Sequence, residues 1–406
     1  MSVVQLSEAV EINPKIDRSQ MNDDLLISFV PMAAVGAADG TIDTSFERAY
    51  SEVKKGYTHF RNDDVLFAKV TPCMENGKMA VARNLRNGVG FGSTEFHVLR
   101  PREGVEPKYV YHFVSSKTFR REAARHMTGA VGLRRVPSAF LESAEIPLPP
   151  MSRQREIVAE IEKQFSRLDE AVANLKRVKA NLKRYKAAVL RAAVEGRLVP
   201  TEGDWAHVEL GDIAQSIRNG YSGKPDAESG TRILRISSVR PMALDINDVR
   251  YLSGAPSEYE SFLISPGDVL FTRYNGNRDY VGVCACVSSG IAPTVYPDKL
   301  IRVRVPITVL LPGFLVIAAS TGNTRAFIET RIRTTAGQSG VSGGDLKALP
   351  LKLPSISEQR RIVEAVERRL SLVAGLETQI DAGVIRALRL RESVLSSSFS
   401  AGIPDA

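Results

Sequence analysis

The chain has 406 residues, of which 43% are hydrophobic and 25% charged; this composition is typical of a globular protein and argues against a largely disordered one. It has no run of about 18 apolar residues, no signal-peptide pattern at its start, and too few cysteines for a disulfide framework, so we expect a cytoplasmic protein. The net charge of +8 favours a polyanionic partner, because Lys and Arg gain free energy by displacing counterions from phosphates.

Residues 1–150 are predicted to form a β-rich domain with some helix. Short runs rich in Val, Leu and Phe, such as Asp64–Val70 and Phe96–Leu99, are separated by Gly, Pro and Asn residues, which is the pattern of short strands joined by turns. A helix is expected around Val110–Arg125. The domain ends in Ile146–Pro150, whose prolines indicate an extended segment.

Residues 151–200 are predicted to form a long helix. Ser152 is a suitable N-cap, and from there to about Gly196 the chain has no Pro or Gly, which corresponds to a rod of roughly 65 Å at 1.5 Å per residue. Apolar residues recur every seven positions, and Phe165, Val178 and Tyr185 are among those expected beside this stripe. The heptad residues are Ile161, Leu168, Leu175, Leu182 and Val189.

Residues 201–355 repeat the order of the first 150 and are predicted to form a second β-rich domain. Asp268–Arg273 lies 204 positions after Asp64–Lys69 and matches it closely. Leu300–Arg304 follows Phe96–Arg100 at the same distance. A helix is expected over Leu311–Arg331. Several matches in one register indicate an internal duplication.

Residues 356–400 are predicted to form a second long helix, with heptad residues 205 positions after those of the first. These are Val366, Val373, Ile380, Ala387 and Val394. Such a stripe needs an apolar partner, which is either the helix's own β-rich domain or the other helix. We favour helix–helix pairing, because a rod of this length is longer than a domain of this size. Lys179 and Lys186 interrupt the first stripe, and Gly375 and Gly383 weaken the second helix, so we expect an imperfect pair.

The sequences at the two helix starts, Ile146–Val158 and Leu351–Val363, and at the first helix end, Val189–Leu198, resemble those of the DNA specificity subunits of Type I restriction–modification systems. In the first domain, Phe67–Lys78 and Ser93–Pro101 resemble the target-recognition domains of the same family. The resemblance covers essentially the whole chain and is looser only at the end of the second helix.

The resemblance implies an α+β fold with two β-rich target-recognition domains, residues 1–150 and 201–355, each followed by a spacer helix, residues 151–200 and 356–400. The helices would pair as an antiparallel coiled coil, and the duplication would have pseudo-two-fold symmetry. The family's function implies a non-catalytic subunit that reads a bipartite double-stranded DNA target, one half-site per domain. Implied partners are two methyltransferase subunits, which carry S-adenosylmethionine, and restriction–translocase subunits, which use ATP and magnesium; no cofactor is expected on this chain.

Two other interpretations remain open. The chain could be the specificity chain of a related bipartite system in which methyltransferase and nuclease are fused in one partner. Alternatively, it could be a coiled-coil scaffold that binds no DNA, which specific and salt-sensitive DNA binding would exclude.

The chain has no motif that prescribes a reaction. The Gly-Lys pairs at 77–78 and 223–224 lack the following Ser or Thr of a Walker A loop. Leu148–Met151 has two prolines but neither the Asn or Asp nor the aromatic residue of an amino-methyltransferase loop. Cys284 and Cys286 alternate along a predicted strand and are interpreted as core residues rather than metal ligands. We therefore predict no catalytic site and no metal site.

Polar loops are the candidate DNA-reading segments, because Arg and Lys read guanine in the major groove and Asn and Gln read adenine. Segments 218–224, 273–278 and 333–339 have this composition in the second domain. For each residue the alternative is an ordinary solvated turn. The predicted DNA-contacting residues are Lys69, Thr71, Asn76, Lys78, Arg134 and Arg135 in the first domain, and Arg218, Tyr221, Lys224, Arg273, Asn275, Asn277, Arg278, Arg333 and Gln338 in the second.

Overall fold

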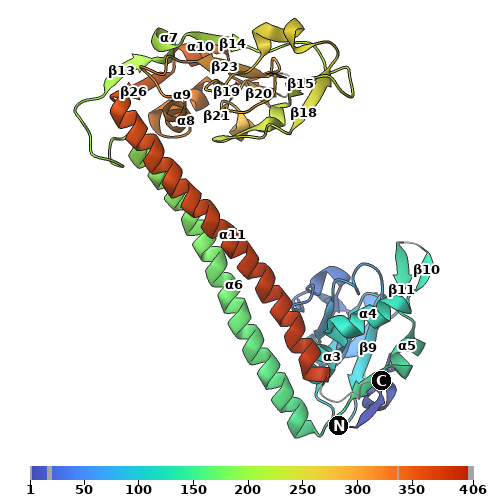
Figure 1. Cartoon of the computed structure of the whole chain (residues 1–406). Helices are drawn as coiled ribbons and strands as arrows, with labels where there is room; N and C mark the ends of the chain where they lie inside the picture. Colours follow the sequence, from blue (N-terminus) through green and yellow to red (C-terminus); the bar gives the residue numbers. More distant parts are fainter. Residues whose placement is uncertain (1, 16–20, 131, 336–337, 401–406) are drawn as a thin grey trace. The chain divides into compact units, whose positions relative to one another are not determined.

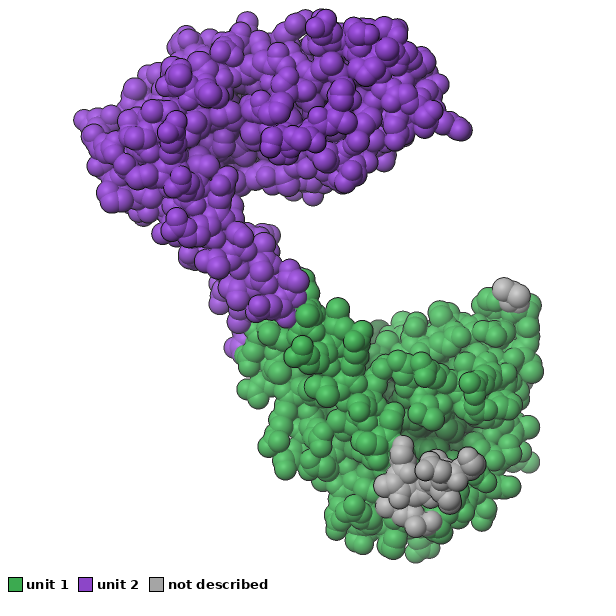
Figure 2. All heavy atoms as spheres, in the orientation of Figure 1, with its two compact units in different colours: residues 1–175, 381–406 green, residues 176–380 purple. Residues whose placement is uncertain are grey.

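The computed structural model of the chain describes residues 2–15, 21–130, 132–335 and 338–400 (Figure 1). The chain divides into two compact units, which are described separately (Figure 2). Unit 1 comprises residues 1–175 and 381–406, and unit 2 comprises residues 176–380. Both units mix sheets with helices, and each contains part of the two long helices α6 (Met151–Val194) and α11 (Ile356–Ser400).

Unit 1 is built around two four-stranded sheets. The first has the antiparallel order β2 (Val10–Ile12), β9 (Phe96–Pro101), β6 (Val65–Ala68), β7 (Met79–Val81). The second has the order β4 (Glu47–Ala49), β3 (Leu26–Val30), β8 (Val89–Gly92), β5 (Thr58–Arg61), with β3 and β8 parallel. Two further pairs are β1 (Val3–Gln5) with β12 (Glu145–Pro147), and the hairpin of β10 (Thr128–Ala130) with β11 (Leu133–Arg135).

The described residues of unit 1 include five shorter α-helices. They are α1 (Leu6–Ala9), α2 (Tyr50–Val53), α3 (Pro107–Ser115), α4 (Lys117–Arg125) and α5 (Ser138–Ser143). The single helix predicted around Val110–Arg125 is therefore two helices. The chain is extended at Ser116, whose Oγ accepts a hydrogen bond from Phe119 N (3.3 Å) and caps α4.

Unit 2 repeats the strand order of the first sheet of unit 1, as β14 (Ser216–Asn219), β23 (Leu300–Arg304), β19 (Val269–Thr272), β21 (Cys284–Cys286). Its second sheet is β18 (Val249–Leu252), β15 (Thr231–Leu234), β22 (Thr294–Val295), with β15 and β22 parallel. A third sheet has the order β20 (Tyr274–Asn275), β25 (Gln338–Gly340), β24 (Arg333–Thr335). The remaining pairs are β13 (Ala206–Glu209) with β26 (Pro350–Leu353), and β16 (Val239–Arg240) with β17 (Ala243–Leu244).

The shorter helices of unit 2 are α7 (Leu210–Ile213), α8 (Pro312–Ala319), α9 (Gly322–Arg331) and α10 (Gly343–Lys347). The helix predicted over Leu311–Arg331 is again divided, between α8 and α9. Cys284 is buried in β21 and belongs to the hydrophobic core, as predicted, while Cys286 is half-buried beside it.

The Asp that opens each Asp-Val-Leu-Phe segment has the same structural role in both units. Asp64 is buried and accepts two hydrogen bonds from the guanidinium of Arg100 in β9 (2.9 and 2.8 Å). Asp268 is buried in the same way beside Arg304 in β23 (2.6 and 3.1 Å). A buried carboxylate needs a charged, hydrogen-bonded partner, so each half carries both the Asp and the Arg.

The glutamine near the start of each long helix has a similar structural role. Gln154 Nε2 donates to Gly104 O (3.0 Å) and Pro149 O (2.8 Å), and its Oε1 accepts from Glu106 N (2.9 Å). Gln359 makes the three corresponding bonds before α8. These amides fix the start of α6 within unit 1 and the start of α11 within unit 2. The first helix begins at Met151, one residue before the predicted N-cap Ser152, so that assignment is wrong.

The two long helices contact each other within each unit (Figure 1). In unit 1, Arg391 of α11 forms an ion pair with Asp169 of α6 (2.7 Å), and Gly383 packs against Leu175, so the contacts run in antiparallel order. In unit 2, Lys186 of α6 forms an ion pair with Glu377 of α11 (2.8 Å).

Most of the predicted heptad residues are shielded from solvent. Ile161, Val189, Val366, Val373, Ile380 and Ala387 are buried, and Leu168, Leu175, Leu182 and Val394 are half-buried. Phe165, expected beside the stripe, is buried. Val178 and Tyr185 are each 46% exposed, so their placement beside the seam is wrong.

Candidate nucleic-acid interface

The predicted DNA-reading segments of unit 2 are joined by backbone hydrogen bonds. Asp298 N donates to Tyr221 O (2.8 Å), Arg273 N donates to Lys299 O (2.8 Å), and Val341 N donates to Arg273 O (2.9 Å). These bonds link residues 218–225, 273–279, 296–299 and the hairpin of 333–335 with 338–341 into one surface, which we call the loop surface of unit 2. Ala336 and Gly337, within the predicted segment 333–339, lie outside the described residues.

Arg273 links these segments. Its Nη1 donates to Asp298 O (3.3 Å), and its guanidinium carbon lies 4.6 Å from the ring centroid of Tyr274. The two contacts restrict the plane of the guanidinium, and its Nη2 has no hydrogen-bond partner among the described residues. A fixed guanidinium with a free donor is suited to a base edge, where planar donor geometry selects the acceptor pattern.

Four other predicted cations of unit 2 are exposed. Arg218 lies on β14 and Lys224 in the loop that follows it. Arg278 donates from Nη2 to Glu329 O (3.3 Å). Arg333 is 78% exposed and lies 4.0 Å from Asp345. Such exposed charges are suited to phosphate contacts, which position a protein on DNA without reading its sequence.

Three of the four remaining predicted residues of unit 2 stabilise the loops through contacts within the protein. Asn275 Oδ1 accepts from Asn277 N (2.9 Å), and Asn277 Oδ1 accepts from Asp279 N (3.0 Å), so both amides stabilise turns. Tyr221 packs edge-on against Tyr259 with 5.2 Å between ring centroids, which gives it a supporting role. Gln338 is exposed in β25.

Unit 1 has the same backbone framework. Lys69 N donates to Glu95 O (2.9 Å) and Val136 N donates to Lys69 O (2.8 Å), which are the bonds that Arg273 makes in unit 2. Thr71 Oγ1 accepts from Arg134 N (3.0 Å) and thereby holds the β10–β11 hairpin to the loop after β6. Residues 69–78, 93–95, 128–130 and 132–135 form what we call the loop surface of unit 1.

The arginines of this surface are paired with acids. Arg135 donates two hydrogen bonds to the carboxylate of Glu95 (2.9 and 2.7 Å). These bonds hold the pKa of Glu95 below its usual range and raise the pKa of Arg135. Arg134 lies 3.6 Å from a carboxylate oxygen of Glu75. Any anionic ligand of either arginine would therefore have to compete with an internal carboxylate.

Two predicted residues of unit 1, Lys78 and Asn76, differ in whether their side chains already form hydrogen bonds within the protein. The ammonium of Lys78 donates to Met32 O (3.1 Å) and Val35 O (2.8 Å), so it holds a neighbouring backbone segment in place. Asn76 is exposed, and only its backbone is used, through a bond from its N to Pro72 O (2.9 Å). Of the two, Asn76 is the more accessible to DNA.

A groove of about 400 Å³ adjoins the loop surface of unit 2. Its lining includes four cationic residues, of which only Lys224 was predicted as a DNA contact; the others are Arg235, Arg250 and Lys299. Lys299 follows Glu95 by 204 positions, but Glu95 is an acid and was not a predicted contact, so the repeat did not point to a cation there. Arg235 and Arg250 also gave no signal, because their counterparts in the first half are not charged.

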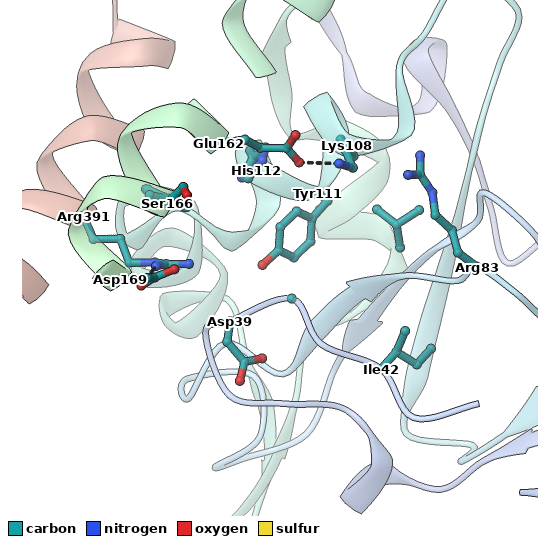
Figure 3. A pocket seen from close by; sticks show the side chains of 13 residues that line it. Asp39, Ile42, Arg83, Lys108, Tyr111, His112, Glu162, Ser166, Asp169 and Arg391 are labelled. Atoms are coloured by element: carbon teal, nitrogen blue, oxygen red, sulfur yellow. Dashed lines mark hydrogen bonds and ion pairs between the residues drawn. The ribbon is translucent and has the colours of Figure 1, made fainter. Parts of the chain in front are cut away.

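A separate cavity of about 540 Å³ lies in unit 1, beside α3, α6 and α11 (Figure 3). Its charged groups are largely paired, Lys108 with Glu162 (2.5 Å) and Arg391 with Asp169 (2.7 Å). It contains none of the predicted DNA-contacting residues. Gly40, at φ +71°, leaves room for Tyr111, since a Cβ there would lie 2.5 Å from the phenol oxygen.

His112 beside this cavity is buried, and neither of its ring nitrogens has a hydrogen-bond partner among the described residues. Its ring packs edge-on against Phe165 with 5.8 Å between centroids. Burial lowers the pKa of His112 to about 3, with smaller contributions from Lys108 and Arg391, so it is neutral at physiological pH. It is a packing residue rather than a general acid or base.

Among the described residues, no group of three or more His, Cys, Asp or Glu side chains is arranged to hold a metal ion. Nor does any helix in the described part of the chain have the length and apolar character needed to cross a membrane.

Comparison with known proteins identifies similar sequences. A family model described as the Type I restriction modification DNA specificity domain matches residues 2–184. The chain is 33% identical to the EcoKI specificity subunit of Escherichia coli K12 over 311 residues, 74% of this chain and 67% of that one. It is 23% identical to the EcoEI specificity subunit of Escherichia coli, with 98% of this chain and 82% of that one covered.

Similar folds occur among solved structures. A chain in a structure of a type I R-M system has a TM-score of 0.77 at 20% identity, with 99% of this chain and 98% of that chain covered. The HsdS subunit from Thermoanaerobacter tengcongensis has a TM-score of 0.67, also at 20% identity, and covers 99% of this chain. At this identity the likeness is one of fold.

Proposed function

Because this chain belongs to the family of Type I restriction enzyme specificity subunits, we propose that it reads a bipartite DNA target with one half-site for each recognition domain. The observation that carries the proposal is the repeated backbone framework of the two loop surfaces. Lys69 and Arg273 occupy equivalent positions in it and make equivalent bonds, yet the side chains around them differ. One scaffold with two sets of polar side chains is suited to reading two different short sequences.

We assign the recognition domains to residues 1–150 and 201–355, and the spacer helices to residues 151–200 and 356–400. In the second domain, Arg273 is the proposed base-reading residue, supported by its fixed guanidinium and free Nη2. In the first domain, Arg135 and Asn76 have that role. The other predicted contacts are proposed as phosphate or loop-supporting residues, Lys78 and Tyr221 among the latter.

The proposed partners are two methyltransferase subunits and restriction–translocase subunits. S-adenosylmethionine, ATP and magnesium would be bound by those partners, and this chain would act without catalysing a reaction itself. The long helices are the proposed scaffold on which the partners assemble. The proposed location of this chain is the cytoplasm.

We also propose that the helices set the spacing between the half-sites. Antiparallel pairing along rods of roughly 65 Å would hold two recognition domains in opposite polarity about a pseudo-two-fold axis, separated by at most about two turns of DNA. Inserting one heptad into both helices should lengthen the required gap and leave the half-site sequences unchanged. An unchanged gap would contradict this role for the helices.

The function is tested by mapping methylated bases in a host that lacks other methyltransferases and expresses this chain with its methyltransferase subunits. The proposal predicts methylation within a split motif whose two specified parts are separated by a gap of fixed length. A control host that expresses the methyltransferase subunits alone should show no such motif. Methylation of one uninterrupted motif, or methylation without this chain, would contradict the proposal.

A further inference from the structure

The groove beside the loop surface of unit 2 concentrates positive charge. Its lining includes Lys224, Arg235, Arg250 and Lys299, with Asp298 as the acidic residue among them. Lys224, Arg250 and Lys299 form no hydrogen bond or ion pair through their side chains with other described residues. Arg235 is the exception, since it pairs with Asp248 (3.2 Å). Three cations of the groove are therefore available to a ligand.

The groove adjoins Arg273, the proposed base-reading residue of unit 2. Lys299 O accepts the backbone hydrogen bond of Arg273, and Asp298 O accepts from the guanidinium of the same residue. Lys224 belongs to the loop that holds Tyr221 against the 296–299 turn. A DNA strand with a base at Arg273 would thus carry its neighbouring phosphates toward these cations.

The equivalent positions of unit 1 are not basic. Ile233 and Phe29 are equivalent, because each pairs in parallel with a strand residue 62 positions further along the chain, Val295 and Phe91. Arg235 then corresponds to Pro31. Arg250, opposite Ile233 in β18, corresponds to Phe46, whose O accepts from Phe29 N (2.7 Å).

At the third position the two units carry opposite charges, Lys299 in unit 2 and Glu95 in unit 1. Lys299 corresponds to Glu95, since each accepts the backbone N–H of the first residue after the shared strand. In unit 1 this Glu binds the guanidinium of Arg135, while the position that corresponds to Arg135 in unit 2 is Gly340. At these three positions unit 2 thus has two cations that pair with no described residue, Arg250 and Lys299, and Arg235, which pairs with Asp248, where unit 1 has an aromatic ring, a carboxylate and a proline.

We propose that this groove binds the phosphodiester backbone of DNA beside the second half-site, and that unit 2 supplies more of the electrostatic affinity for DNA than unit 1. The inference rests on the proposed function and adds an asymmetry to it. Lys and Arg that neutralise phosphates release condensed counterions, which gives affinity with little regard to sequence and makes it depend steeply on salt.

The test is a titration of labelled duplexes with the full chain in complex with its methyltransferase subunits, between about 50 and 200 mM salt, a range over which phosphate contacts dominate the change in affinity. The duplexes are the mapped target and versions altered in one half-site. The groove variant combines Lys224→Gln, Arg250→Gln and Lys299→Gln. The control combines Lys347→Gln, Lys352→Gln and Arg360→Gln, exposed residues of unit 2 that do not line the groove.

The groove variant should reduce the magnitude of the slope of log K against log salt by about 2 to 3, because each lost phosphate contact accounts for about 0.9. Its affinity for the target and for the altered duplexes should fall by the same factor, and the control should bind as the wild type does. A second variant, Lys224→Arg with Lys299→Arg, should retain the wild-type slope and thereby separate loss of charge from loss of folding.

Two results would overturn the inference while leaving the proposed function intact. One is a slope and affinity equal to those of the control variant. The other is a loss confined to discrimination at the second half-site with an unchanged slope, which would make the groove a base-reading site. Failure of the wild-type complex to distinguish the target from the altered duplexes would instead contradict the proposed function.

Discussion

The arginines of the two loop surfaces lie in different electrostatic surroundings. In unit 1, Arg135 is bound by Glu95 and Arg134 lies beside Glu75. In unit 2, Arg273 is held by a backbone carbonyl and an aromatic ring, neither of which neutralises its charge. The same backbone framework therefore presents partly neutralised arginines in unit 1 and, at Arg273 of unit 2, an arginine that pairs with no carboxylate among the described residues. The two units share this backbone framework, and the side chains on it set the charge that DNA would meet.

The largest expected effect concerns the buried carboxylate that the two units share. Asp268→Asn should destabilise unit 2 by about 3 to 5 kcal/mol, because it leaves Arg302, which is 3% exposed, and Arg304 without a buried counter-charge. Asp64→Asn should cost less, about 2 kcal/mol, because it leaves only Arg100, which is 15% exposed. Hydrogen exchange measured separately over each unit checks both values. Equal losses of stability in the two variants would show that the second arginine, Arg302, does not make Asp268 more important than Asp64.

The second prediction tests the neutralised arginine of unit 1. Glu95→Gln should strengthen DNA binding by about 5- to 10-fold and steepen the salt slope by about 1, because the charge of Arg135 is no longer neutralised and its guanidinium becomes free to contact DNA. Equilibrium titration with labelled target DNA measures both quantities. Glu156→Gln, which removes an exposed carboxylate paired with Arg153 (2.7 Å), is the matched control and should change neither. An unaltered slope in Glu95→Gln would argue against Arg135 as a DNA contact.

A third prediction uses a buried position at which the units differ. His112 in α3 corresponds to Ile317 in α8, which is 2% exposed and apolar. The pKa of His112, about 3, lies below the ordinary value of about 6.5, so the unfolded chain binds a proton that the folded chain does not between these two values. Wild-type unit 1 should therefore lose stability as the pH falls through this window.

His112→Ile removes that loss and should stabilise unit 1 by about 1 kcal/mol at pH 5.5 relative to its effect at pH 7.5. Hydrogen exchange over unit 1 at the two pH values provides the measurement. The converse variant Ile317→His places an unpaired imidazole in unit 2 and should make that unit acid-sensitive. If His112→Ile shows the wild-type pH dependence, then His112 is not the group responsible.

The smallest effect concerns the ion pairs between the long helices. Lys186 and Glu377 in unit 2 are each about one-third exposed, as is typical of pairs that contribute about 0.2 to 1 kcal/mol. Asp169 and Arg391 in unit 1 have the additional contact of Arg391 over the ring of Phe165 (3.9 Å). Lys186→Ala should therefore cost less than Arg391→Ala, and a double-mutant cycle for each pair measures the coupling. A larger coupling in unit 2 would reverse this order.

Much of the fold follows from features that the sequence carries locally. The uninterrupted helix formers after residue 151 and the repeated Asp-Val-Leu-Phe segments predicted both long helices and the two β-rich regions. The break at Ser116 was missed, because its capping hydroxyl lies inside a run of otherwise helical residues. Val178 and Tyr185 were misplaced because heptad spacing alone does not say which residues beside the stripe the partner helix covers.

The loop surfaces were harder to predict than the fold. Composition selected the loops, and the structure joins those of unit 2 into one surface, but the partner of each cation depends on contacts between residues far apart in the sequence. The ammonium of Lys78 is bound by carbonyls more than 40 positions away, and Arg135 by an acid 40 positions away. Arg250 was missed because it lies on a strand whose side chains no repeat or loop motif singled out.

The central claim is that each recognition domain reads its own half-site. It is tested most directly by replacing residues 201–355 with a second copy of residues 1–150 and mapping the bases methylated by the resulting complex. Two copies of one reader should produce a motif whose half-sites are inverted copies of each other, one of them identical to a half-site of the wild type, with the gap retained. A methylated motif in which neither half-site matches the wild type, or an unchanged wild-type motif, would contradict the claim.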